Sequence, residues 1–404
     1  MIHISTSFAL LVVAIIILVC IAGSRLSGRL GVPTLFIFIM LGMLFGSDGI
    51  FKIPFGNFAL AEQVCSVALI FIMFYGGFGT RWSEAKPVAG RSILLSSAGV
   101  VLTAFLTGLF CHLVLKMALM EGMLLGAVLG STDAASVFSI LRSRKLNLKY
   151  GTASMLELES GSNDPFAYMM TVILLSAMTG SVSGGSAVLL LIRQLAFGLL
   201  TGAAVAWLVT WLLKRYAFYG EGFDTIFVFA AAIISYALAS QIGGNGYLSV
   251  YLTGIILGNQ ELKNQKALVG FFDAFTGMMQ MLLFFLLGLL AFPSQMPSIV
   301  LPAIAIALFL TFVARPAAVG LLLAPSKPPI GQYLVISWAG LRGAASIVFA
   351  IMATLSEGYM KYDIFHIVFC VVLFSIIFQG SLLPKVAEKC DMIDNSTDVM
   401  RTFS

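Results

Sequence analysis

A cluster of acidic residues lies inside a stretch of chain that is otherwise apolar enough to cross a lipid bilayer. Residues 157–165 read Glu-Leu-Glu-Ser-Gly-Ser-Asn-Asp-Pro, which places Glu157, Glu159 and Asp164 within two helical turns. Ionised groups at membrane depth are costly, so they are rare and commonly mark a path for ions or protons. This chemistry points to the handling of small cations rather than to covalent catalysis.

The spacing of these groups predicts a polar ribbon along one helix. Glu157, Ser160 and Asp164 are separated by three and four positions, so they share a helical face, and Glu159 and Asn163 form the adjacent stripe. The alternative is a buried polar network that only holds helices together. Three carboxylates and an amide in so short a stretch favour an ion site over that alternative.

A second polar feature interrupts the apolar segment 123–141. Gly130, Ser131 and Thr132 weaken the helix just before Asp133. An unwound turn at membrane depth is allowed only against protein or water, and its carbonyls could bind a cation beside the Asp133 carboxylate. Asp133 could also cap a half-helix that starts at the next residue, and the two roles are compatible.

Three arginines also fall inside apolar segments. Arg342 lies deep in the segment 331–354 and needs an acidic partner, for which Glu157 and Glu159 are the candidates. Arg193 and Arg315 are expected nearer the ends of their segments, where they reach the interface or pair locally.

The rest of the chain must position these groups within a membrane. It has 404 residues, 60% hydrophobic and 10% charged, whereas a soluble domain carries about 25% charged residues. The basic residues are scattered, which argues against a nucleic-acid partner and makes lipid the expected surroundings. The cysteine and histidine spacings match no disulfide or metal framework, and no nucleotide-binding motif is present, so we expect no cofactor and no enzymatic activity.

Hydropathy predicts an all-α polytopic membrane protein with about thirteen transmembrane helices. The approximate limits are 6–23, 32–46, 58–79, 91–115, 123–141, 151–178, 186–213, 223–242, 246–258, 269–291, 298–323, 331–354 and 363–383. With these limits, 17 Lys and Arg residues fall on one side and three on the other. The excess of positive charge predicts an N-terminus outside and a C-terminus in the cytoplasm, in the plasma membrane.

An odd number of spans permits an internal inverted repeat. Residues 1–180 and 223–384 would be the two copies, lying upside down relative to each other. The segments 123–141 and 331–354 then occupy equivalent places, and both are interrupted by glycine. We therefore expect broken helices that cross near the binding site.

Three motifs resemble the signatures of the NhaP branch of cation/proton antiporters, in the same order and spacing. They are Gly130-Ser131-Thr132-Asp133-Ala134-Ala135, Glu159-Ser160-Gly161-Ser162-Asn163-Asp164-Pro165 and Gly340-Leu341-Arg342-Gly343-Ala344. The resemblance covers residues 1–390 and implies an NhaA-like fold, with a dimerisation domain and a mobile core, assembled as a homodimer. The residues 391–404 are expected to be a short cytoplasmic tail without the TrkA-C-like regulatory domain that such proteins usually have.

The resemblance also implies roles for individual residues. Asp164 would bind either the cation or the proton, and Asn163 replaces the second Asp of electrogenic relatives, which implies electroneutral exchange. Glu159 would pair with Arg342. The remaining ligands of the monovalent cation would be Thr132, Asp133 and Ser160.

Selectivity is expected to favour potassium over sodium. The form of the second motif resembles bacterial potassium/proton antiporters. Tyr75 stands where archaeal sodium members have an acid, and a site with one carboxylate fewer suits a larger, weakly hydrated cation. Tyr75 and Glu157 are the auxiliary candidates.

Competition for one carboxylate provides the expected mechanism. Burial favours the neutral acid, whereas a bound alkali ion favours the carboxylate, so K⁺ or Na⁺ competes with H⁺ for the oxygens of Asp164. The alternatives are a sodium-coupled symporter for an organic solute with the same fold, and an ion channel or membrane sensor.

Overall fold

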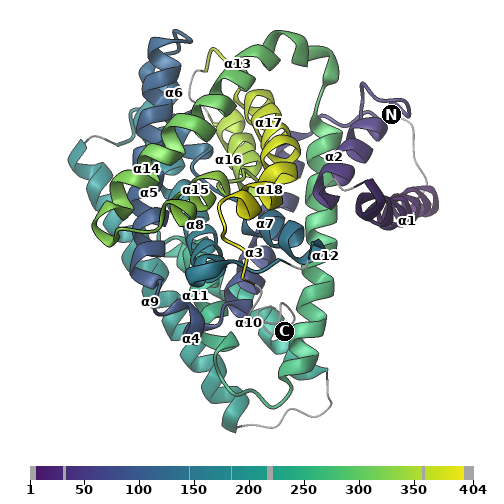
Figure 1. Ribbon diagram of the computed structural model, residues 1–404. Coiled ribbons are helices and arrows are strands. Elements are labelled where there is room, and N and C mark those ends of the chain that lie inside the picture. The colour runs from purple at the N-terminus through teal and green to yellow at the C-terminus, as the bar shows by residue number, and fades with distance from the viewer. Residues whose placement is uncertain are drawn as a thin grey trace.

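Helices make up nearly all of the described chain (Figure 1). The structure is a computed structural model that describes residues 6–30, 33–144, 146–182, 184–215, 222–356 and 360–394. The helices are α1 (Thr6–Leu30), α2 (Thr34–Phe45), α3 (Phe58–Gly79), α4 (Trp82–Ala85), α5 (Ala89–Leu113), α6 (Leu119–Val128), α7 (Ala134–Ser143), α8 (Thr152–Met178), α9 (Gly184–Arg215), α10 (Phe223–Gln241), α11 (Gly246–Gly258), α12 (Gln265–Leu290), α13 (Met296–Phe309), α14 (Arg315–Leu323), α15 (Ile330–Trp338), α16 (Ala344–Leu355), α17 (Ile364–Phe374) and α18 (Ser381–Lys389).

The thirteen predicted spans are confirmed as helical segments within these ranges. Among the described residues, seven stretches are long and apolar enough to cross a membrane by length and composition, and five further apolar helices are shorter. Two segments contain π-helical turns, at Leu310–Ala314 between α13 and α14 and at Ser375–Gly380 between α17 and α18. The first predicted span was too short, because its helix continues past residue 23 to Leu30.

The two glycine-interrupted spans are both broken, as predicted. Residues 129–133 separate α6 from α7, and residues 339–343 separate α15 from α16. The two breaks touch, since the Asp133 amide donates a hydrogen bond of 2.8 Å to the Leu341 carbonyl. A side chain at Gly343 would collide with that of Asp133, so the close crossing needs a glycine there.

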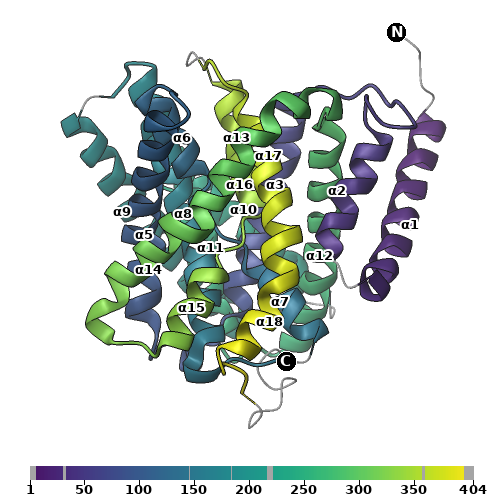
Figure 2. The same ribbon diagram turned by 45° about the horizontal axis from the view of Figure 1, so that its top comes forward.

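The long helices run roughly alongside one another, with α1 and α2 at one edge and α9 at the opposite edge (Figure 2). Elements far apart in sequence pack together: α2 lies against α12, and α3 lies against α11. The order long, short, long, long, broken, long recurs in α1–α8 and again in α10–α18, which is what an inverted repeat requires. The exact limits of the repeats stay a prediction, and most of the predicted tail, 391–404, lies outside the described residues.

The end of α17 that faces the α12–α13 connection is held by a short hydrogen-bonded chain. The Asp363 carboxylate caps the helix, accepting from the His366 amide at 3.1 Å and pairing with its ring Nδ1 at 2.6 Å. The Phe292 amide donates to the ring Nε2 at 3.1 Å, so Nδ1 is the nitrogen that donates to Asp363. Burial tends to raise the pKa of Asp363, but the hydrogen bonds from His366 outweigh it and hold that pKa below its usual range.

We expect replacement of this cap to destabilise the protein in a pH-dependent way. Asp363→Ala should cost about 1 kcal/mol at neutral pH because the first turn of α17 loses its cap. An aspartate whose pKa is depressed on folding stabilises the protein above its unfolded pKa of about 4, and this contribution disappears as pH falls through the folded pKa. Thermal melting in detergent should show a lower melting temperature for the variant than for wild type at pH 7, and this difference should shrink in acid. A difference of constant size would contradict this, and Glu388→Ala, at an exposed position of α18, is the control.

Candidate functional site

Helix α8 presents two different faces. Glu159, Ser160 and Asn163 are buried, with exposed fractions of 1%, 7% and 1%. Glu157 and Asp164 stay partly exposed, two turns apart on the opposite stripe. One face therefore packs into the protein, whereas the other can be reached from solvent.

Asp164 lies against the first helix break. The Ser131 hydroxyl donates a hydrogen bond to Asp164 Oδ1. Among the described residues, no lysine, arginine or histidine forms a salt bridge with Asp164. Its carboxylate thus has a hydroxyl partner but no fixed counter-ion, which leaves a mobile cation or a proton to neutralise it.

The predicted ligands Thr132, Ser160 and Asn163 form one hydrogen-bonded group beside Asp164. Thr132 Oγ1 lies 2.7 Å from Ser160 Oγ, and Asn163 Nδ2 donates to Thr132 Oγ1 at 2.5 Å. The Thr132 amide donates to Asn163 Oδ1 at 3.2 Å. Asn163 thereby satisfies the unwound backbone, a positioning task that sequence reasoning did not assign to it.

Asp133 caps helix α7, which confirms one of the two roles considered for it. Its carboxylate accepts from the Ser136 amide at 3.2 Å and from the Ser136 hydroxyl. The side chain keeps partial exposure beside the break that also contains Ser131 and Thr132. Its role as a cation ligand stays a prediction.

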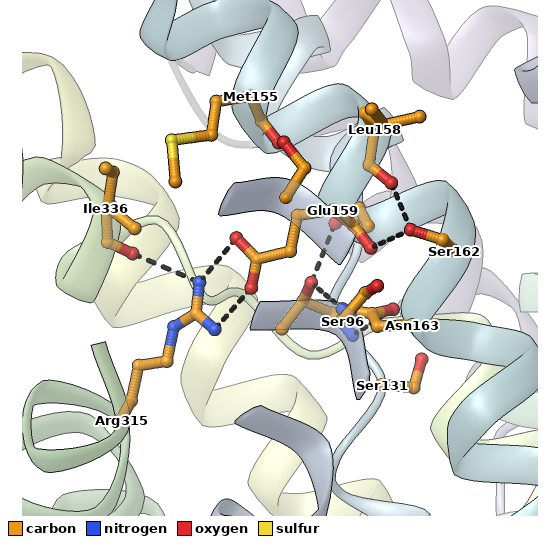
Figure 3. A network of polar contacts seen from close by, with 12 residues as sticks. Ser96, Ser131, Met155, Leu158, Glu159, Ser162, Asn163, Arg315 and Ile336 are labelled. Carbon is orange, nitrogen blue, oxygen red and sulfur yellow. Dashed lines mark hydrogen bonds and ion pairs between the residues drawn. The ribbon is translucent and has the colours of Figure 1, made fainter. Parts of the chain in front are cut away.

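The predicted partner of Glu159 was wrong. Arg315, and not Arg342, forms the ion pair with Glu159, through two bonds of 2.5 and 2.9 Å (Figure 3). Arg315 is only 4% exposed and also donates to the Ile336 carbonyl at 3.3 Å. The expectation that Arg315 lies near the end of its segment was therefore wrong too. It is the only charged residue between Met296 and Leu323, a signal of burial that the sequence already contained.

Arg342 has a different task, at the crossing of the two breaks. Its side chain donates to the Ser131 carbonyl at 3.1 Å, and its amide donates to Ser375 Oγ at 2.9 Å. The guanidinium thus satisfies the carbonyl of Ser131, the residue whose hydroxyl contacts Asp164. A cavity of about 10 Å³, roughly the room of one water molecule, lies between Arg342, Arg315 and both π-helical turns.

The auxiliary candidates lie on the partly exposed side of α8. The Tyr75 hydroxyl donates to Asp273 Oδ1 at 3.2 Å. The Thr80 hydroxyl donates to Glu157 Oε1 at 3.4 Å, a long hydrogen bond. Neither contact includes Asp164.

We expect the two glutamates of α8 to differ sharply in their effect on stability. Glu159→Gln leaves the buried Arg315 charge without its partner and should cost about 3–5 kcal/mol. Glu157→Gln, at a partly exposed position, should change stability by less than about 1 kcal/mol. Thermal melting of the purified variants in one detergent makes the comparison, and equal losses would contradict the assignment of the ion pair.

Comparison with known proteins identifies the family of the chain. Residues 13–389 match the family described as sodium/hydrogen exchanger, transmembrane. The chain is 36% identical to the K⁺/H⁺ antiporter NhaP of Alkalimonas amylolytica over 382 residues, 94% of this chain and 66% of the relative. It is also 36% identical to the K⁺/H⁺ antiporter NhaP2 of Shewanella oneidensis, over 93% of this chain and 66% of that protein. The chain thus spans about two thirds of the length of these relatives.

A solved structure shows the same fold. The sodium proton antiporter MjNhaP1 of Methanocaldococcus jannaschii, at pH 8, superposes with a TM-score of 0.82 at 22% identity, covering 96% of this chain and 99% of that one. The chain belongs to the family of transmembrane sodium/hydrogen exchangers.

Proposed function

We propose that this protein is an electroneutral monovalent cation/proton antiporter that exchanges K⁺ for H⁺, with Na⁺ as the competing cation. The observation that carries the proposal is the environment of Asp164. This carboxylate lies at mid-helix against the first break, keeps partial exposure, and has the Ser131 hydroxyl as its hydrogen-bond partner.

Such a carboxylate can bind one positive species at a time. Surrounding protein disfavours the bare charge, so the site is stable when it holds either a proton or an alkali cation. A transition between the two sides of the membrane with an empty charged site would be costly. The site therefore crosses only when it is loaded, and this rule couples the two fluxes without any other energy source.

The neighbouring residues complete an oxygen-rich site. Hard cations prefer oxygen ligands, and Ser131, Thr132 and Ser160 offer hydroxyl groups next to the unwound carbonyls. Asn163 contributes an amide and no charge, so one proton exchanges for one monovalent cation and the site carries the same net charge both ways. This supports electroneutral exchange.

Potassium is favoured for two reasons. The two relatives compared above are named K⁺/H⁺ antiporters, although they are longer than this chain. Tyr75 supplies a phenol at a position where a further carboxylate would strengthen the negative field acting on the cation. The Tyr75 hydroxyl donates its hydrogen bond to Asp273. A weaker field favours the larger and more weakly hydrated ion.

We infer an arrangement in the membrane from the distribution of charge. The bias of Lys and Arg supports a multi-pass protein of the plasma membrane with the N-terminus outside and the C-terminus in the cytoplasm. The end where α8 begins, near residue 152, is then the cytoplasmic one. A homodimer fits the large apolar residues exposed on α9, among them Leu200 and Trp207, which need a cover of lipid or protein.

Asp164→Asn should abolish cation-driven proton movement. Proteoliposomes with a preset pH gradient and an internal pH dye would receive KCl, NaCl, RbCl or LiCl in turn. Wild type should collapse the gradient, with K⁺ effective at lower concentration than Na⁺, and without a change in membrane potential. Asp391→Asn, an exposed carboxylate, should behave as wild type.

Three results would refute this proposal. Full exchange by Asp164→Asn would exclude the carboxylate as the binding group. Cation flux that needs no proton gradient and changes the potential would indicate a channel. Dependence on an added organic solute would indicate a symporter.

A further inference from the structure

A second polar cluster lies on the partly exposed side of α8, and we call it the Tyr251 cluster. It consists of Thr80 at the end of α3, Glu157 on α8 and Tyr251 on α11. The Glu157 carboxylate, the Thr80 hydroxyl and the Tyr251 phenol bring three oxygen groups together from three helices. None of these residues has a place in the Asp164 site described above.

The Tyr251 hydroxyl is the observation that points to a ligand. The side chain is 3% exposed, and its oxygen has no hydrogen-bond partner of normal geometry among the described residues, because the Thr80 hydroxyl interacts with it only outside that geometry. A buried polar group without a partner lowers the stability of the folded protein. A phenol kept at this position is therefore expected to meet a ligand during function, because a phenylalanine would fill the same space without that cost.

The other two groups of the cluster are joined by a long hydrogen bond. The Thr80 hydroxyl donates to the Gly76 carbonyl at 2.9 Å, and its bond to Glu157 Oε1 is longer, at 3.4 Å. One hydroxyl hydrogen cannot serve both acceptors well. A cation beside Glu157 would be attracted by its carboxylate, with the Thr80 oxygen as a further ligand.

The cluster lies nearer the N-terminal end of α8 than Asp164 does. Glu157 and Asp164 are seven residues apart, about 10 Å along the helix axis. Gly161 lies between them, and a Cβ atom there would come within 2.5 Å of Tyr251 Oη. The phenol ring thus rests on the glycine midway between the two carboxylates, and both act on it electrostatically.

The backbone beside the cluster is held in place at the end of α3. Asn259 donates to the Thr80 carbonyl at 2.8 Å. Gly76, one turn before Thr80, is exposed, with no atom within 4 Å of the position of a Cβ. The glycine therefore leaves this surface of α3 without a side chain.

We propose that Glu157, Thr80 and Tyr251 form a second, transient site for a partly hydrated monovalent cation, at the α8 N-terminal side of Asp164. Tyr251 binds the ion as it loses water and passes from Glu157 to Asp164. The inference rests on the proposed antiport function, and it makes Tyr251 a residue that determines cation affinity from one side of the membrane only.

Sidedness makes the test specific. Right-side-out and everted membrane vesicles, from a host without its own cation/proton exchangers, would be titrated with KCl while a pH dye reports proton movement. Tyr251→Phe should raise the half-saturating K⁺ concentration about tenfold when K⁺ is added to the α8 N-terminal side, as expected for the loss of one ligand to a charge. Addition from the opposite side should give the wild-type value. Tyr333→Phe is the matched control, because its hydroxyl bonds to Pro316 on a distant element.

A double-mutant cycle tests whether the residues act as one site. Glu157→Gln alone should raise the half-saturating concentration from the same side, and Tyr251→Phe should add little to it. Thermal stability of Tyr251→Phe without alkali cation should equal or exceed that of wild type, because an unpartnered hydroxyl is removed.

The possible failures are distinguishable. No exchange by wild type would overturn the antiport function itself. Exchange by wild type together with an unchanged half-saturating concentration in Tyr251→Phe would overturn only the second site. An equal change in the half-saturating concentration from both sides would also overturn the second site, because the phenol would then act at Asp164. Fully multiplicative effects in the double variant would overturn it too, because the phenol would then act independently of Glu157.

Discussion

Unwound backbone inside an apolar bundle needs hydrogen-bond partners, and this constraint organises the whole structure. The partners come from the opposite break and from α8. The bonds run from Asp133 to Leu341, from Thr132 to Asn163 and from Arg342 to Ser131. The same bonds bring the Ser131 hydroxyl against Asp164. Satisfying the backbone therefore also builds the proposed cation site, and neither break could be straightened into a regular helix without losing these bonds.

The charges of the core are divided between structure and exchange. Arg315 binds both oxygens of the buried Glu159, so this acid is neutralised permanently. Arg342 is directed to a backbone carbonyl instead. Asp164, five residues beyond Glu159, is left with neutral partners. The separation matters because an arginine beside Asp164 would compete with both the proton and the transported cation.

Helix α8 combines the two tasks through its periodicity. Residues three and four apart share a face, so Glu159 and Asn163 point into the packed core while Glu157, Gly161 and Asp164 follow the partly exposed side. Tyr251 reaches this side from α11 and rests on Gly161. The family resemblance pointed to Asp164 and its neighbours on α8. The position of Tyr251 beside Gly161 became visible only in the structure.

The sequence by itself determined the helical class, the thirteen segments, both breaks and the acidic helix, because these depend on hydropathy and on glycine at particular positions. It also indicated Asp133 as a helix cap, which is a local interaction. The partner of Glu159 was decided only by the tertiary structure, because Arg315 lies 156 residues away and helix packing determines which of two buried arginines reaches the acid. The contact of Tyr251 with α8 was hidden for the same reason. A tyrosine in an apolar segment resembles core packing until the neighbouring helices show that its hydroxyl has no hydrogen-bond partner of normal geometry among the described residues.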